Sequence, residues 1–210
     1  MVHLREGICL KTLAEKDVVP GEVWEIPAMA KCGSSLLCTY PPCHPLYAVT
    51  SDYFFHVVRV NRNGKTKNKA TLISKYIYKR DAGNIVLPKT DEIMLDTTTS
   101  TSLALRMVGM ILPFEQFSCN CKHYNDYVRY GKTFGSWRNL AYLPASSNCP
   151  VFNIITGIDQ VNSPDFKLQD SRGNAYSPNH APIEGTVQDF ISTHFDTRLE
   201  KGCFHKKRKR

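Results

Sequence analysis

Apolar runs in the first half of the chain predict β-strands. The turn signal Pro20-Gly21 is followed by residues 22–26, where apolar and acidic positions alternate imperfectly around a tryptophan, which predicts a strand. Residues 46–60 are dense in β-branched and aromatic side chains. The part over 53–60 is too apolar to be exposed on both faces, and we therefore expect it in a core or an interface.

Polar positions then divide the next segment into turns and further strands. Residues 61–64 predict a turn, and the lysines after it predict a solvated loop. Alternation over 70–79 predicts another strand, and a short one follows at 85–87 before Pro88.

The second half changes to helical and loop signals. Hydroxyl residues at 97–102 predict a cap for a helix over 103–111, and apolar residues at three-to-four spacing over 114–130 predict one helical face. From 132 to 181, Gly, Pro, Asn and Ser predict loops with a short strand at 151–156. A weak helical pattern covers 186–193.

Length and composition fit one soluble domain. The 210 residues are 42% hydrophobic, which is enough for a core. No apolar run reaches the roughly 18 residues that a membrane helix needs, and the first eleven residues lack the apolar centre of a signal peptide. We expect a protein that is made inside the cell and does not contact a membrane.

The formal charge of +8 is concentrated at the C-terminus. Clustered cations favour contact with phosphate, because each one displaces counterions without reading sequence. The alternatives are a solvated tail with no partner and a nuclear import signal. The predicted nucleic-acid-binding residues are Lys206, Lys207, Arg208, Lys209 and Arg210.

Eight cysteines without a secretion signal favour free thiols or metal ligands over disulfides. Several lie near histidines, but they lack the paired C-x-x-C spacing typical of structural zinc sites. We therefore predict free thiols and no metal or other cofactor, with a zinc site as the alternative. The weak metal candidates are Cys38, Cys43, His44, Cys119, Cys121 and His123.

No familiar catalytic motif occurs in the chain, and we predict that it is not an enzyme. Residues 38–46 resemble the zinc-binding segment of His-Cys box homing endonucleases. Those enzymes need a histidine just before this segment as general base, and Ser35, Leu36 and Leu37 stand there instead.

Aromatic and basic residues also mix near the end of the second predicted helix, where they fit either base stacking or packing. We favour packing, because the aromatics fall partly on the helix's own apolar face. These residues are Tyr127, Arg129, Tyr130, Lys132, Phe134, Trp137 and Arg138.

Three patches, in order, resemble the major capsid protein of the Microviridae, the icosahedral single-stranded DNA phages. Residues 18–28 and 51–59 are similar to that family's P-G-D-x-F-x-M strand entry and Y-F-F-F-V-P-x-R strand. Residues 101–110 are similar to its G-S-L-x-D-Y-L-G-L helix. Residues 112–114 and 124–129 resemble its L-P-F-R-x-Y and Y-N-x-Y-F-R pair.

The resemblance implies a mainly β fold with inserted helices, namely a viral jelly roll, the eight-stranded antiparallel β-barrel. The resemblance covers residues 18–129, and family members are considerably longer. We therefore expect either a shortened, diverged relative or a truncated reading frame, with a barrel that is incomplete if the last 80 residues do not contribute strands to it. We expect one capsid-like domain over 1–205, followed by the basic tail. Its parts are N-terminal strands over 5–88, a helical insertion over 100–131 and a loop-rich part over 132–205.

The implied function is that of a structural virion protein that self-assembles into a T=1 icosahedral shell. The implied partners are further copies of the chain, packaged single-stranded DNA and other virion proteins. The implied location is the virion, with assembly in the host cytoplasm. The alternative is a zinc-stabilised nucleic-acid-binding protein, and a His-Cys box-like nuclease is less favoured.

Overall fold

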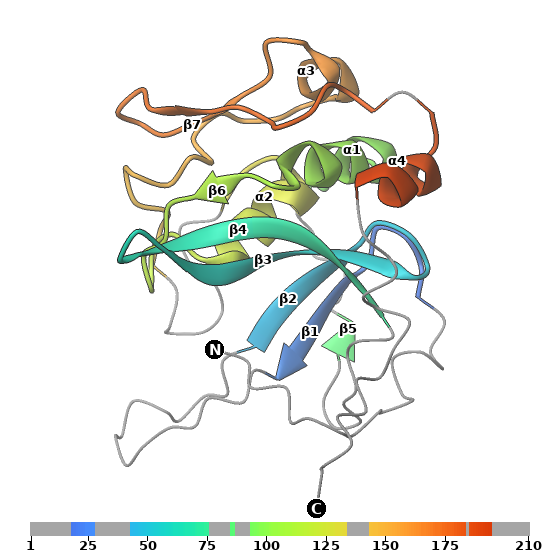
Figure 1. Ribbon diagram of the computed structural model, residues 1–210, viewed down its shortest axis with the longest axis horizontal. Helices are drawn as coiled ribbons and strands as arrows, with labels where there is room; N and C mark the ends of the chain where they lie inside the picture. Colours follow the sequence, from blue (N-terminus) through green and yellow to red (C-terminus); the bar gives the residue numbers. More distant parts are fainter. Residues whose placement is uncertain are drawn as a thin grey trace, which may run out of the picture.

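A computed structural model describes residues 18–27, 43–75, 85–86, 93–133, 143–183 and 185–194. Within these ranges the chain forms a six-stranded antiparallel sheet with strand order β5-β1-β2-β3-β4-β6, a two-stranded sheet and several helices (Figure 1). The strands are β1 (Val23–Pro27), β2 (Cys43–Ala48), β3 (Tyr53–Arg62), β4 (Lys65–Ser74), β5 (Ile85–Val86), β6 (Ile111–Leu112), β7 (Leu168–Gln169) and β8 (Ala175–Tyr176). The helices are α1 (Thr97–Met107), α2 (Cys121–Tyr130), α3 (Ile158–Asn162) and α4 (Val187–His194).

The elements lie in layers, as Figure 1 shows. Helices α1, α2 and α4 lie over one face of the large sheet, and the segment with α3 and β7 lies beyond them. This antiparallel sheet with a few helices agrees with the predicted mainly β class. None of the described helices has both the length and the apolar character needed to cross a membrane.

The large sheet buries apolar side chains on both of its faces. On the helix-covered face, Phe55 and Val57 of β3 join the same core as Leu105 of α1 and Tyr127 of α2. The opposite face carries a second cluster, which we call the outer cluster. It consists of Val18, Trp24, Leu46, Ala48 and Phe54, with the half-buried Ile73 packed against it.

The predicted strands 22–26 and 53–60 are confirmed as β1 and β3, but the predicted lysine loop is wrong. Residues 65–69 are the first half of β4, which pairs with β3 along its whole length. The turn between the strands consists of Asn63 and Gly64, whose φ angles of 52° and 71° fit a tight two-residue hairpin turn. Such a turn leaves no room for a loop.

Helix α1 begins six residues before the predicted start at 103. Asp96 is its N-cap, because its carboxylate accepts hydrogen bonds from the Thr99 backbone N–H at 2.9 Å and the Thr99 hydroxyl at 2.6 Å. The hydroxyl residues therefore form the first turns of the helix itself.

Helix α2 covers only the end of the predicted helix over 114–130. Asn120 caps it in a box with His123, and Gly131 ends it in the left-handed conformation at φ 69°. Residues 114–120 instead form a turn closed by a bridge between Glu115 and Cys119. Apolar spacing alone did not reveal this boundary, because the cap is made by side-chain hydrogen bonds.

The loop-rich part is tied to the helices by a buried arginine. Arg106 of α1 donates hydrogen bonds to the carbonyls of His180 at 2.6 Å and Ser163 at 3.3 Å. Burial lowers the pKa of its guanidinium. The predicted strand at 151–156 is wrong, since these residues have no strand pairing, whereas the predicted helix near 186–193 is confirmed as α4.

A disulfide joins Cys119 to Cys149 across 30 residues, so the prediction of free thiols is wrong for these two cysteines. Residue spacing cannot reveal such a pairing, because the fold brings the two residues together. Both side chains lie in the core.

Candidate functional site

The β3–β4 hairpin is the most strongly charged feature of the described chain. From position 59 to position 69 the sequence contains five basic residues and no acidic one. They are Arg59, Arg62, Lys65, Lys67 and Lys69. The hairpin therefore carries a formal charge of +5, if each of these side chains is counted once.

Three of the lysines form a row along β4, which we call the lysine ladder: Lys65, Lys67 and Lys69. They alternate with Thr66 and Asn68, and alternate residues of a strand share one face at intervals of about 6.7 Å. The register places Lys69 opposite Val58 and Lys67 opposite Val60. Lys65 and Lys69 are exposed and Lys67 is half-buried.

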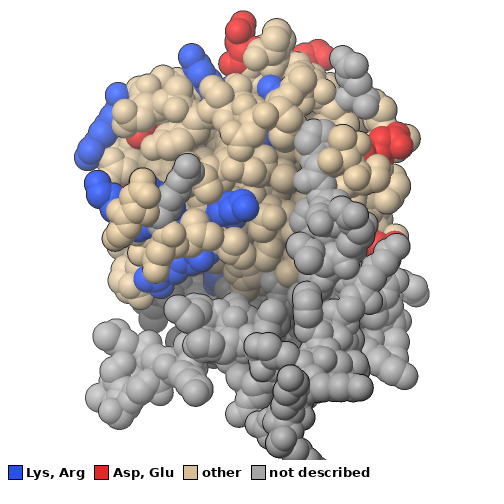
Figure 2. All heavy atoms as spheres, in the orientation of Figure 1, with Lys and Arg blue, Asp and Glu red and all other residues tan. Residues whose placement is uncertain are grey.

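No carboxylate of the described residues forms an ion pair with the lysine ladder. The ion pair between Lys75 and Asp52, at 2.9 Å, lies after the other end of β4. Figure 2 shows Lys and Arg atoms gathered along the side where Figure 1 places the β3–β4 turn. Asp and Glu atoms lie mainly at the top and on the opposite side of this view. Within the part of the chain that the structure describes, the ladder is thus a positive strip without an acidic partner.

The loop after β6 lies beside the hairpin and brings aromatic side chains to it. The Asn68 side-chain amide donates hydrogen bonds to the carbonyls of Pro113 and Cys119, which holds this loop against β4. The Arg59 guanidinium stacks 4.7 Å from the centre of the Phe114 ring. Phe117, in the same loop, keeps 51% of its surface exposed.

The acidic residue of this loop, Glu115, is hydrogen-bonded to neutral side chains. Its two carboxylate oxygens accept hydrogen bonds from Asn148 at 2.8 Å and from Ser118 at 2.6 Å. The bonds from Asn148 and then Ser118 are the main causes that lower the pKa of the Glu115 carboxyl.

Two histidines meet on the sheet between β2 and β3. His44 Nε2 lies 3.1 Å from His56 Nδ1, so one ring donates a hydrogen bond to the other. Burial lowers the pKa of His44 to about 4. Burial, and then the proximity of His44, hold the pKa of His56 well below its usual value.

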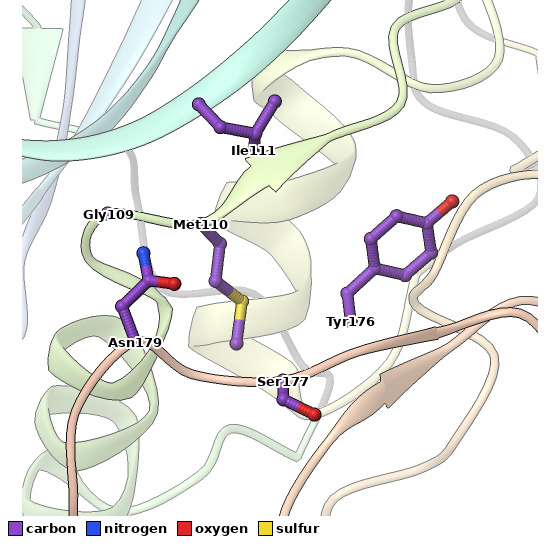
Figure 3. A pocket seen from close by; sticks show the side chains of 6 residues that line it. All are labelled: Gly109, Met110, Ile111, Tyr176, Ser177 and Asn179. Carbon is purple, nitrogen blue, oxygen red and sulfur yellow. The ribbon is translucent and has the colours of Figure 1, made fainter.

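A shallow cavity of about 300 Å³ lies between the end of α1, β6 and the segment after β8 (Figure 3). The side chains that offer hydrogen bonds there are the phenol of Tyr176, the hydroxyl of Ser177 and the amide of Asn179. Gly109 has φ 85°, and a Cβ at this position would lie 2.8 Å from Asn179 Nδ2. The lining offers hydrogen bonds but no carboxylate, histidine or thiol.

The residues predicted to bind nucleic acid, 206–210, lie outside the described residues, and so does Cys38. Of the other weak metal candidates, Cys43 is in β2 and its side chain is not described. His44 is hydrogen-bonded to His56, as described above.

The remaining metal candidates are engaged at the start of α2. Cys119 is in the disulfide and cannot serve as a thiolate ligand in that state. His123 contacts Asn120 through Nδ1 and the Leu143 carbonyl through Nε2 at 3.0 Å. Cys121 is half-buried at the first position of the helix. The described residues contain no group of three metal-ligating side chains.

Packing is confirmed for Tyr127 and Tyr130, which are both buried in α2. The Tyr127 hydroxyl donates a hydrogen bond to the Asn153 carbonyl at 2.6 Å, and burial raises its pKa above the usual value. Phe134, Trp137 and Arg138 lie outside the described residues.

Sequence reasoning missed the lysine ladder. The signal was present as the alternation K-T-K-N-K directly after a two-residue turn signal, Asn63-Gly64. Because lysine is common in solvated loops, the alternation was interpreted as a loop.

Comparison with known proteins found no matching family model, no matching curated protein and no matching solved structure.

Proposed function

We propose that the chain is a structural virion protein, a subunit of the icosahedral shell of a single-stranded DNA phage. In this proposal its large sheet is one wall of a jelly roll, and the basic tail 206–210 contacts the packaged genome. The proposal rests on the ordered resemblance of residues 18–129 to the Microviridae capsid protein and on the form of the sheet.

The supporting observation is the outer cluster. Trp24 of β1, Leu46 of β2 and Phe54 of β3 are almost completely buried on the face that does not face the helices. A jelly roll needs such a second apolar face, because its two sheets pack against each other through side chains. Two of the strands that supply the cluster, β1 and β3, fall in the first resembling patches.

The helical elements fit the same proposal. In a jelly roll with inserted helices, the insertion lies outside the barrel. Helices α1 and α2 lie on the face of the sheet opposite to the outer cluster (Figure 1). Shell proteins function through their surfaces, which pack many identical copies side by side.

The proposal is tested by sedimentation of the full-length protein with and without single-stranded DNA. We expect large assemblies whose formation depends on DNA and on salt, because the tail's affinity for phosphate is electrostatic. Deletion of 206–210 should weaken DNA binding and its salt dependence. A protein that stays monomeric at high concentration with DNA present contradicts the proposal.

A further inference from the structure

We infer that the lysine ladder of β4 is a second nucleic-acid-binding site, which takes the phosphate backbone of a single strand laid along the hairpin. This site is separate from the tail 206–210. It also does not depend on shell formation, because every residue that forms it lies on one hairpin of a single chain.

The first argument is the unbalanced charge. Lys65, Lys67 and Lys69 share one face of the strand, and like charges on neighbouring positions of one face repel each other. No described carboxylate compensates them. A polyanion laid along the row removes this repulsion and releases its own counterions, so both effects favour binding.

The second argument is the shape of the row. Because β4 is extended, its three ammonium groups follow a line, with about 6.7 Å between successive lysine positions. An extended single strand presents its phosphates in a similar line. Phe117 takes no part in this row, because the loop that carries it is held by Asn68, whose side chain lies on the opposite face of β4 from the lysines.

A structural role is the competing explanation for these lysines. Among the described residues, β6 pairs with β4 at Asn68 and Lys69, and Gly109 and Met110 hydrogen-bond to Ala70. The edge beside Lys65 and Lys67 has no described strand partner, and charged residues at such edges prevent pairing with other chains. Negative charge protects an edge as well as positive charge does. Charge reversal therefore separates edge protection from phosphate binding.

The experiment measures binding of a fluorescent oligothymidylate to the full-length protein over a range of salt concentrations. The test variant is K65Q/K69Q, and the matched control is K167Q/R172Q, which removes two exposed charges from the segment beyond the helices. The test variant should lower the slope of log K against log salt by about 1.4, since each phosphate contact contributes about 0.7 for single strands. The control should leave the slope unchanged.

The reversed variant K65E/K69E should remain as soluble as the wild type and bind still more weakly than K65Q/K69Q. Equal slopes for K65Q/K69Q and the wild type would overturn the inference, as would an equal loss in the control. Hairpin-dependent binding of a duplex as tight as that of the single strand would overturn the assignment to a single strand.

The same measurements in a chain that lacks 206–210 separate this inference from the proposed function. If the ladder binds, K65Q/K69Q weakens binding further in the shortened chain. Loss of assembly with the ladder effect intact contradicts only the shell proposal. Normal assembly without a ladder effect contradicts only the inference.

Discussion

The His44–His56 pair makes stability depend on pH at the scale of single residues. Both rings stay neutral in the folded protein, because burial lowers the pKa of His44 to about 4 and that of His56 well below its usual value. In the unfolded chain each histidine takes up a proton near pH 6.5. The unfolded state therefore binds more protons as the pH falls below 6.5, and folding is weakened.

We expect the free energy of unfolding to fall by about 1 kcal/mol per pH unit for each neutral histidine as the pH decreases from 6.5 to 5. Carboxylates with lowered pKa values, such as Asp96, contribute mainly at lower pH. Urea unfolding at several pH values measures this slope. H44Q/H56Q should flatten it, and an unchanged slope in this variant contradicts the role of the pair.

The Cys119–Cys149 disulfide links the start of α2 to the loop-rich part of the chain. Closing a loop of 30 residues reduces the entropy of the unfolded chain. We expect C149S to lower the free energy of unfolding by about 3–4 kcal/mol in denaturant titrations, on the loop-entropy model.

A reducing agent supplies the control for the disulfide. It should destabilise the wild type by a similar amount and have little further effect on C149S. If reduction leaves the wild type unchanged, the disulfide does not contribute to stability in solution.

At the scale of elements, the end of α2 is fixed by a close approach of two backbone segments. Gly131 has φ 69°, and its carbonyl accepts a hydrogen bond from the Ile155 N–H at 2.8 Å. A Cβ on residue 131 would collide with the Ile155 carbonyl oxygen. Glycine is therefore needed for both its conformation and its size.

We expect G131A to lower the free energy of unfolding by about 1–3 kcal/mol, from left-handed strain plus the collision. G64A is the matched control, because Gly64 also has a positive φ angle but nothing lies near its missing Cβ. Thermal unfolding should show a larger loss for G131A. Equal losses would mean that the contact with residue 155 costs nothing.

The elements also show what the sequence could predict. Strands β1 and β3 and helix α4 follow from local apolar patterns, which agree with their final burial. The start of α1 could not be predicted from the apolar pattern. The hydrogen-bonded carboxylate of Asp96 caps the helix, although the hydroxyl residues after it are themselves common caps. The start of α2 depends on the local capping box of Asn120 and His123, whereas its end lies against Ile155, which is distant in sequence.

The candidate site was less predictable than the fold. The lysine ladder exists because β4 starts at Lys65 and continues without a bulge, so that the alternation places three lysines on one face, and the register with β3 decides which face this is. The charge run itself was visible in the sequence. The disulfide was not predictable, because eight cysteines allow many pairings and only the fold selects one.

At the scale of the whole molecule, the arrangement of the sheet, the helices and the charged hairpin can be compared with what a shell subunit needs. The sheet has a helix-covered face and a second apolar face, and the positive hairpin projects from one end (Figures 1 and 2). A shell subunit needs a packed wall, surfaces for neighbouring copies and a positive surface toward the genome. The sheet with its two apolar faces fits the packed wall, and the positive hairpin fits the surface toward the genome.

Electron microscopy of the full-length protein mixed with circular single-stranded DNA tests the shell proposal most directly. The account predicts closed particles of uniform size that form with DNA and are lost at high salt. A uniform population of monomers at high protein concentration, with and without DNA, would contradict it.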